Sequence, residues 1–284
     1  MKKITVTKKT TAKVVGGLAK YIVLIFIFAF LLFPVYWMLV TALKTNIESY
    51  RLVPTLWPET ILDGFKTLIS DGKFLVYYKN NIIVSAMAAV IICFISVFAG
   101  YALSRFHFKW NKMLLATFAF AQMMPVISRL ISLYTILRKL NLTDTHIGLV
   151  LAISATQVPF TVSLMASFFD GIPGELEEAA SIDGSGRFYT LFHIIMPLVV
   201  PGLLAVGVYS FLMTWDDYLH AITLIRSNDL WTLSQGLKLT YLGEVSDWQL
   251  INSASTLGTV PMIFVFFFFQ KYMIKGLTAG AVKG

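Results

Sequence analysis

The chain has 284 residues, of which 57% are hydrophobic and 13% are charged, and its formal net charge is +8. Ordinary soluble domains carry about 25% charged residues, so this composition excludes a soluble fold and predicts an all-α integral membrane protein. Its Lys and Arg residues gather at the ends of apolar runs. That pattern is typical of membrane topology signals and argues against a nucleic-acid partner.

Six apolar spans follow along the chain, and each approaches or exceeds the about 20 residues that a membrane-crossing helix needs. No backbone polar group can stay unpaired in hydrocarbon, so each span is predicted to be a helix. The first run is longer than the about 7–15 apolar residues of a signal peptide, which indicates an uncleaved helix. The predicted spans cover residues 19–43, 80–104, 113–136, 146–168, 197–215 and 252–272.

Lysines are concentrated before the first span and at its start, at Lys2, Lys3, Lys8, Lys9, Lys13 and Lys20. The positive-inside rule therefore places the N-terminus in the cytoplasm, and six spans return the C-terminus to the same side. The sequence predicts a cytoplasmic N-terminal segment at 1–18, a six-helix transmembrane domain at 19–273 with a cytoplasmic loop at 170–196, and a cytoplasmic tail at 274–284.

Two long loops are predicted on the outer side of the membrane. Residues 44–79 contain Pro54, Trp57, Pro58 and mixed charges, which indicates a folded cap with aromatic residues at the membrane interface. Residues 216–251 are long enough to contain short helices that dip back into the protein.

The cytoplasmic loop has strong local signals. Pro173-Gly174 ends the fourth span, and Glu175, Glu177 and Glu178 then occupy the first turn of a new helix, where negative charge complements the helix dipole. Asp183-Gly184 predicts that this helix stops at a tight turn, because Gly adopts a left-handed conformation at low cost.

A second helix follows the turn. Phe188, Leu191, Phe192 and Ile195 have the i, i+3, i+4, i+7 spacing of one helix face, and Pro197 marks the entry to the fifth span. This helix–turn–helix is either an ordinary amphipathic interfacial loop or a rigid knob presented to a soluble partner.

The motifs in this region resemble a known family. Glu178-Ala179-Ala180, Gly184, Ile194 and Met196-Pro197 resemble the EAA loop of ABC-importer permeases, with Met196 where Leu is usual. Three further segments are similar to the carbohydrate importers of that family, and most of all to the maltose-type G subunit. They are Ala99-Gly-Tyr-Ala-Leu-Ser-Arg-Phe106, Trp215-Asp-Asp-Tyr-Leu219 and Gly276-Leu-Thr-Ala-Gly-Ala-Val-Lys-Gly284.

The resemblance implies the type I ABC importer permease architecture in a prokaryotic cytoplasmic (inner) membrane. It implies four kinds of partner: a second homologous permease subunit, two ATPase subunits, an extracytoplasmic solute-binding protein and the lipid bilayer. Glu178 is the residue expected to pair with a basic group of the ATPase. The resemblance assigns contact with the ATPase to Glu175, Glu178, Ala179, Ala180, Asp183, Gly184, Arg187, Phe188 and Pro197.

The chemistry of the chain agrees with a transport subunit that is not itself an enzyme. The sequence contains no Gly-x-x-x-x-Gly-Lys-Ser/Thr phosphate loop, so we expect ATP and Mg to bind the partner ATPase and no cofactor to bind this chain. Its single cysteine, Cys93, and its scattered histidines predict no metal site. No catalytic residues are assigned.

Polar and aromatic side chains within or beside the spans are candidates for the lining of a solute pathway. The alternative for each is helix-to-helix packing. Arg129, near Pro125, is expected to snorkel or to pack against a partner. The candidate lining residues are Gln122, Tyr209, Met213, Trp215, Asn252 and Ser253, with Gln157 beside them.

The sequence therefore predicts a permease subunit of an ATP-driven, binding-protein-dependent importer, forming half of the translocation pathway for an oligosaccharide or related glycoside. Two alternatives stay open: a permease of the same class for a non-sugar solute, and a membrane scaffold subunit of a non-transport ATPase complex. A secondary transporter would need buried carboxylates that relay protons, and a membrane enzyme would need a nucleophile with a base. The sequence indicates neither.

Overall fold

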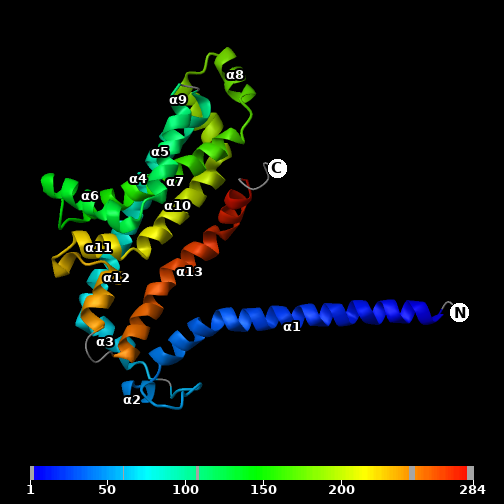
Figure 1. The fold of residues 1–284 in the computed structure, drawn as a ribbon, viewed down its shortest axis with the longest axis vertical. Coiled ribbons are helices and arrows are strands. Elements are labelled where there is room, and N and C mark those ends of the chain that lie inside the picture. The colour runs from blue at the N-terminus through cyan, green and yellow to red at the C-terminus, as the bar shows by residue number, and fades with distance from the viewer. Residues whose placement is uncertain (1–2, 60, 107–108, 243–246, 280–284) are drawn as a thin grey trace. The chain divides into compact units, whose positions relative to one another are not determined.

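The computed structural model describes residues 3–59, 61–106, 109–242 and 247–279, and every regular element within these ranges is a helix (Figure 1). The chain divides into two compact units. The first contains residues 1–70 and 244–257, and the second contains residues 71–243 and 258–284. The all-helical prediction is confirmed. Residues 280–284 of the predicted tail lie outside the described residues.

The first unit is built on α1 (Lys3–Ala42), with the short α2 (Asn46–Ser49), most of α3 (Asp63–Asp71) and the start of α13 (Trp248–Ala279). Helix α13 packs here through Ser253, whose hydroxyl donates to the Ala42 carbonyl at 3.3 Å. A Cβ on Gly64 would lie 2.5 Å from that hydroxyl oxygen, so this contact requires glycine on α3.

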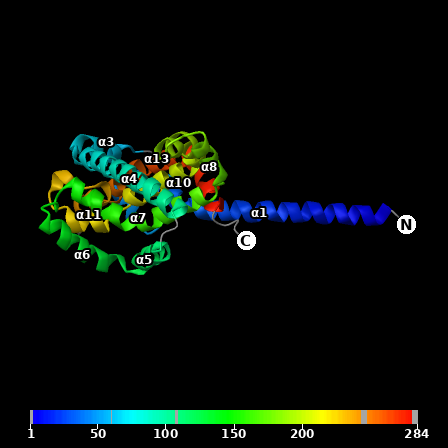
Figure 2. The same cartoon turned by 90° about the horizontal axis from the view of Figure 1, so that it is seen from above.

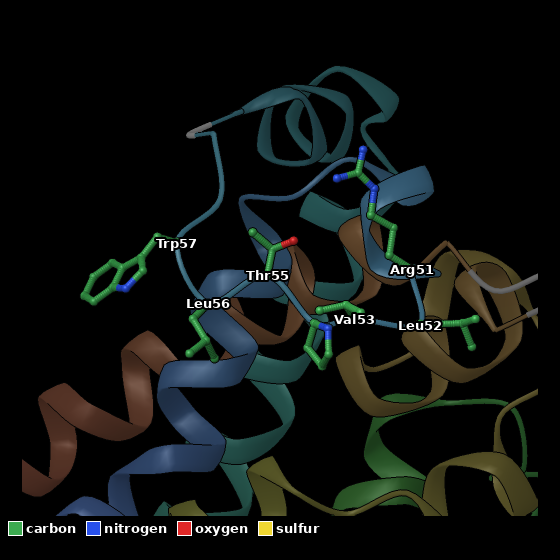
Figure 3. Close-up of a pocket in the computed structure, with 7 residues that line it drawn as sticks. Arg51, Leu52, Val53, Thr55, Leu56 and Trp57 are labelled. Carbon is green, nitrogen blue, oxygen red and sulfur yellow. The ribbon is translucent and has the colours of Figure 1, made fainter.

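The loop after α2 turns back along α1. The Tyr36 hydroxyl donates to the Leu56 carbonyl at 2.5 Å, and the Tyr36 and Trp57 rings meet edge to face at 6.2 Å. Leu52 and Trp57 are exposed and point away from the ribbon (Figure 3). Residues 44–59 thus form a folded segment with exposed aromatic and aliphatic side chains. The predicted loop at 44–79 extends too far, because residues from Lys73 onward belong to the long helix Lys73–Arg105.

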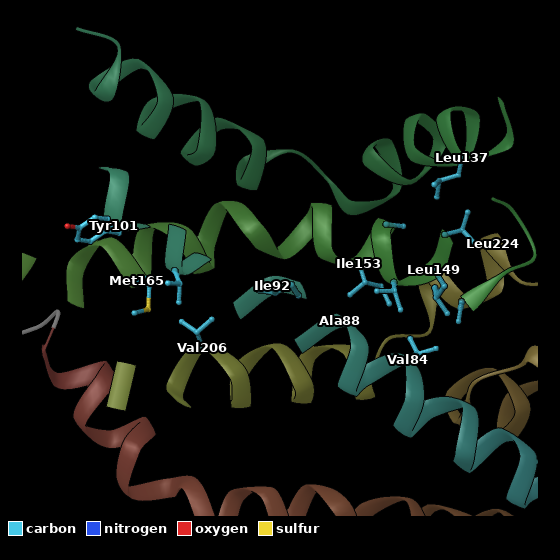
Figure 4. Close-up of a cluster of buried hydrophobic side chains, with 14 of the residues drawn as sticks. Val84, Ala88, Ile92, Tyr101, Leu137, Leu149, Ile153, Met165, Val206 and Leu224 are labelled. Carbon is cyan, nitrogen blue, oxygen red and sulfur yellow. The ribbon is translucent and has the colours of Figure 1, made fainter. Parts of the chain in front are cut away.

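The second unit holds three long helices side by side: α4 (Lys73–Arg105), α7 (His146–Asp170) and α10 (Met196–Trp215) (Figure 1 and Figure 2). Their shared core contains Ala88 and Ile92 of α4, Ile153 and Met165 of α7, and Val206 of α10 (Figure 4). The side chains in this core are apolar and close-packed, which is what holds helices together in a lipid environment.

Helices α4 and α7 approach closely. A Cβ on Gly100 would lie 2.9 Å from the Met165 Cβ and 3.0 Å from the Ala166 backbone nitrogen. One turn away, the buried Ser96 hydroxyl donates to the Thr161 hydroxyl at 2.9 Å. Small and hydroxyl-bearing residues at the contact are typical of membrane helix pairs, because they allow close backbones and interhelical hydrogen bonds.

Within the described ranges, five helices are long and apolar enough to cross a membrane: Lys20–Ala42, Lys73–Arg105, His146–Asp170, Arg187–Trp215 and Trp248–Lys271. The prediction of one continuous helix at 113–136 is wrong. That region forms α5 (Asn111–Met123) and α6 (Val126–Lys139), bent by 105°. Pro125 is the cause, because it lacks an N–H donor and pushes Met124 into an extended conformation (φ −68°, ψ 134°). The part of the chain that the structure describes then has six candidate spans if this bent pair counts as one.

Short helices fill the segment after α10, as predicted for residues 216–251. They are α11 (Leu219–Leu224), the 3₁₀ turn η2 (Asn228–Leu230), α12 (Leu233–Gly236) and the π-turn η3 (Leu237–Tyr241). The Gln235 side chain donates to the Ile225 carbonyl at 3.0 Å and holds α12 beside α11.

Asp144, in the loop between α6 and α7, holds the segment after α10 in place through hydrogen bonds. Its carboxylate accepts hydrogen bonds from the Ser227 hydroxyl (2.5 Å), the Ser227 N–H (2.9 Å) and the Arg226 N–H (2.8 Å). The Ser227 hydroxyl, followed by these two backbone donors, lowers the pKa of Asp144 below its usual value. We call this set of contacts the Asp144 clasp.

We expect Gly100→Ala to destabilise the protein by about 1–3 kcal/mol, because its new methyl group forces α4 away from α7. Gly174→Ala is the matched control, since a Cβ at Gly174 meets nothing within 4 Å. Thermal unfolding of the two purified variants tests this. Equal melting temperatures for both would mean that the helix contact does not require glycine.

The Asp144 clasp predicts a pH dependence. The folded-state pKa of Asp144 lies below the unfolded value of about 3.9, so the stabilisation from its charge is present above that value. It is lost as the pH falls through the folded pKa. The melting-temperature difference between wild type and Asp144→Asn should therefore be largest near neutral pH and should shrink in acid. If the melting-temperature difference stayed constant with pH, the charge of Asp144 would not stabilise the fold through these contacts.

Candidate coupling segment and membrane cavity

The predicted helix–turn–helix is present. Helix α8 (Glu175–Ile182) begins with three glutamates in its first turn, and α9 (Arg187–Tyr189) follows it. Gly184 lies between them with φ +81°, and the Ser185 N–H donates to the Ala180 carbonyl at 2.9 Å. The predicted bounds of the first helix and the left-handed conformation of Gly184 are confirmed. We call residues 175–189 the coupling segment, after the ATPase contact that the resemblance predicts for it.

Glu177 anchors α8 to the end of α4. One carboxylate oxygen lies 2.5 Å from Arg105 Nε, and the other accepts a hydrogen bond from the Tyr101 hydroxyl at 2.9 Å. Arg105 also donates to the Ile172 carbonyl at 3.0 Å. The side chains of Arg105 and Glu177 are only 16% and 20% exposed, so water screens the pair less than a surface pair.

A second contact reinforces this anchor. The Ser104 hydroxyl donates to the Asp170 carboxylate at 2.6 Å, which joins the last turns of α4 and α7. The guanidinium of Arg187 lies 5.2 Å from the centre of the Phe106 ring, within the range of a cation–π contact. The coupling segment therefore contacts the end of α4 through α8 and the residue directly after α4, Phe106, through α9.

The structure separates the predicted ATPase contacts into two groups. Ala180 is 5% exposed, so it packs against the chain itself. Ile182 was not among the predicted contacts, although it is 86% exposed on the outer side of α8. The remaining predicted residues are all exposed: Glu175, Glu178, Ala179, Asp183, Gly184, Arg187, Phe188 and Pro197.

The predicted single face of the second helix is divided. Leu191 and Ile195 are buried, whereas Phe188 is 72% exposed and Phe192 is 47% exposed. Residues Thr190–Ile195 form a π-helical segment, η1, between α9 and α10. Its i→i+5 bonding widens the turn, so residues spaced for an α-helix no longer lie on one line.

A cavity of about 730 Å³ lies where the α5–α6 break meets α7, α10 and α11. Three predicted lining residues reach it: Gln122, Tyr209 and Met213. Tyr209 packs against Phe160 with ring centres 4.8 Å apart. Gln157 also lines the cavity, and its amide donates to the Thr214 hydroxyl at 3.2 Å.

Charged groups line the same cavity. Arg129 begins the second turn after the break, and its Nε is buried with no hydrogen-bond partner among the described residues. The buried His220 ring lies 2.7 Å from the Asp217 carboxylate and 3.2 Å from the Thr156 hydroxyl. The cavity thus combines aromatic faces, amides and charges.

The other three candidates lie elsewhere. Trp215 is 4% exposed, and its indole donates to the Gly258 carbonyl at 3.1 Å. Asn252 donates to Trp248 of its own helix at 2.8 Å, and Ser253 is buried against Ala42 in the first unit. For Trp215 and Ser253 this arrangement favours the alternative of helix packing.

Sequence reasoning missed Glu177, Tyr101 and Arg105 as a unit. Tyr101 and Arg105 belong to the conspicuous segment at 99–106, and Glu177 was noted only for its helix position. The partners are 72 and 76 residues apart, and no local pattern links them. The only available signal was one arginine at the end of an apolar span facing a glutamate-rich loop.

Comparison with known proteins identifies the family. Residues 92–279 match the family described as binding-protein-dependent transport system inner membrane component. The chain is 33% identical to the inner membrane ABC transporter permease protein YcjP of Escherichia coli, over 98% of this chain and 99% of the relative. It is 31% identical to the trehalose/maltose transport system permease protein MalG of Thermococcus litoralis, over 89% and 92% of the two chains.

The fold agrees with a solved relative. A chain from the crystal structure of a bacterial ABC transporter involved in the import of alginate has a TM-score of 0.80 and 21% identity, covering 92% of this chain and 97% of that one. The solved structure shows the fold, and the family is shown by the match from residue 92, within α4, to residue 279, the end of α13, and by the two relatives above 30% identity. The protein belongs to the binding-protein-dependent transport system inner membrane components, which are ABC transporter permeases.

Proposed function

We propose that this chain is the permease subunit that forms half of the pathway of an ATP-driven importer for an oligosaccharide or related glycoside. Its partners are a second homologous permease, two ATPase subunits that bind and hydrolyse ATP with Mg, and an extracytoplasmic binding protein. The family match and the trehalose/maltose relative support this proposal. In a prokaryotic inner membrane, residues 1–18, 170–196 and 274–284 face the cytoplasm.

One observation carries the proposal: the coupling segment is exposed on one side and anchored to a membrane helix on the other. Glu175, Glu178, Ile182 and Phe188 are available to a partner, whereas Glu177 is bound to Arg105 and Tyr101. A partner that moves α8 therefore pulls on the end of α4. Because α4 packs along α7 and α10, that displacement reaches the helices around the cavity.

The cavity suits a solute with both apolar faces and hydroxyl groups. The Phe160 and Tyr209 rings offer flat apolar surfaces, and Gln122 and Gln157 offer amide donors and acceptors. We assign solute contact in this chain to Gln122, Tyr209 and Met213, with ATP-driven closure of the partner ATPases changing the shape of the cavity.

The turn of the coupling segment gives a sharp test. Gly184→Val forces a β-branched residue to φ +81°, so we expect it to distort the turn and lower solute-stimulated ATP hydrolysis by about tenfold. Gly186→Ala is the matched control in the same turn, because its φ is −72° and a Cβ there meets nothing within 4 Å. Both are measured in the reconstituted complex. If solute still stimulated ATP hydrolysis fully in Gly184→Val, this turn would not couple the ATPase to the permease.

The anchor gives a second test. Arg105→Ala leaves Glu177 without its charged partner, so we expect transport to fall several-fold while basal ATP hydrolysis persists. Lys109→Ala, an exposed basic residue just beyond α4, should have little effect. The exchanged pair Arg105→Glu with Glu177→Arg should recover part of the transport rate. No recovery, together with normal transport in Glu177→Gln, would show that the pair does not transmit movement.

A further inference from the structure

A second hollow, of about 570 Å³, lies at the N-terminal end of α4 and is separate from the cavity described above. One wall is the first turns of α4, and the other wall is formed by η2, Trp231 and η3. It is lined by Lys73, Val76, Tyr77, Asn228, Asp229, Trp231, Leu239 and Thr240. The proposed import function uses none of these residues.

The walls of this hollow are held in place by buried contacts. The amide of Asn80, which is 6% exposed, donates to the Asp229 carbonyl at 2.7 Å and to the Trp231 carbonyl at 3.0 Å. Tyr77 and Thr240 share a hydrogen bond of 3.2 Å across the hollow. A Cβ on Gly236 would lie 2.2 Å from the Tyr77 ring, so α12 also fixes that ring. The hollow is therefore a built feature of the fold.

Its charged groups are free to bind a ligand. The Lys73 ammonium and the Asp229 carboxylate are exposed on the two walls, and neither forms an ion pair within the described residues. The Asn228 side chain is exposed beside them. A cation and an anion that line one hollow without neutralising each other are complementary to a ligand that carries both charges.

The position along α4 indicates which layer of the membrane the hollow meets. Residues 82–101 form the apolar run of α4, and at 1.5 Å per residue these 20 residues span about 30 Å, the thickness of the hydrocarbon core. Tyr77 precedes Ile82 by five residues, or about 8 Å, which is the outer edge of a headgroup layer about 5–8 Å thick on each side of the membrane.

The apolar and aromatic groups that line the hollow favour a lipid as its ligand. Val76 and Leu239 are 40% and 46% exposed at the hollow. The Trp231 and Tyr77 rings lie 5.9 Å apart, and aromatic residues of this kind favour the membrane interface. The hollow thus offers apolar surface next to a cation and an anion that are not paired with each other.

We propose that this hollow binds the phosphoethanolamine headgroup of a membrane lipid. Lys73 and the Asn228 amide contact the phosphate, and the Asp229 carboxylate with the Trp231 ring contacts the primary ammonium. Val76 and Leu239 cover the apolar CH₂ groups of the headgroup. A phosphocholine headgroup binds less well because its ammonium has no N–H to donate to Asp229. A phosphoglycerol headgroup lacks the cation.

The experiment is lipid retention by the full-length chain in its transporter complex. The complex is equilibrated with an equimolar mixture of phosphatidylethanolamine, phosphatidylcholine and phosphatidylglycerol in detergent, and the bound lipids are counted by native mass spectrometry. We expect Asp229→Asn to lower retained phosphatidylethanolamine by about threefold or more, the size expected for loss of an exposed ion pair, and to leave phosphatidylglycerol unchanged. Lys73→Gln should lower retention of both lipids.

Two variants serve as charge-matched controls. Lys79→Gln removes an exposed lysine of α4 that does not line the hollow, and Glu59→Gln removes an exposed carboxylate in the first unit. Neither should change lipid retention. Equal retention of phosphatidylethanolamine in Asp229→Asn and wild type would overturn the proposal, because a loss that occurs only in Lys73→Gln describes a site for phosphate alone.

Competition with soluble compounds needs no substitution and separates a lipid headgroup from free phosphate. Phosphoethanolamine added to the wild-type complex should displace phosphatidylethanolamine at concentrations where inorganic phosphate does not. Equal displacement by inorganic phosphate would assign the hollow to free phosphate and overturn the lipid proposal. Solute-stimulated ATP hydrolysis, measured on the same samples, reports the import function independently of lipid retention.

Discussion

The close contact between α4 and α7 is the constraint on which the second unit depends. Lipid tails are as apolar as leucine, so helices in a membrane associate through close packing and interhelical hydrogen bonds. Gly100 brings the α4 backbone against Ala166, and Ser96 bonds to Thr161 at the same contact. The same two helices also share a core through Ala88 and Ile92 of α4 and Ile153 of α7, so α7 positions the end of α4 that contacts the coupling segment.

At one end of α4, the residues directly after Gly100 hold the coupling segment. Tyr101 and Arg105 bind the Glu177 carboxylate, and Ser104 binds Asp170 at the end of α7. Since α8 has only one buried residue, Ala180, its position depends on this polar anchor more than on apolar packing. A short helix held by a few charged contacts at the end of a rigid helix is well suited to transmit a displacement.

The break between α5 and α6 shapes the cavity that we propose as the solute site. Pro125 ends one helix and begins the next, and Gln122 and Arg129 on either side of it both line the cavity. A continuous helix over these residues would separate Gln122 from Arg129 by about 10 Å along one axis. The bend instead turns α6 away, and the space that it leaves is bounded by Tyr209 of α10 and His220 of α11.

The sequence by itself determined the helical class, five of the spans, the bounds of α8 and the left-handed turn at Gly184, because these follow from local hydrophobicity, helix capping and glycine geometry. Pro125 was visible, but the sequence does not state how far a proline bends a helix. Only the tertiary structure decided that Glu177 binds Arg105, that Ala180 and Trp215 are buried, and that Gln122, Tyr209 and Met213 share a cavity. These pairings join residues far apart in the chain, and they depend on how whole helices pack, which no local pattern encodes.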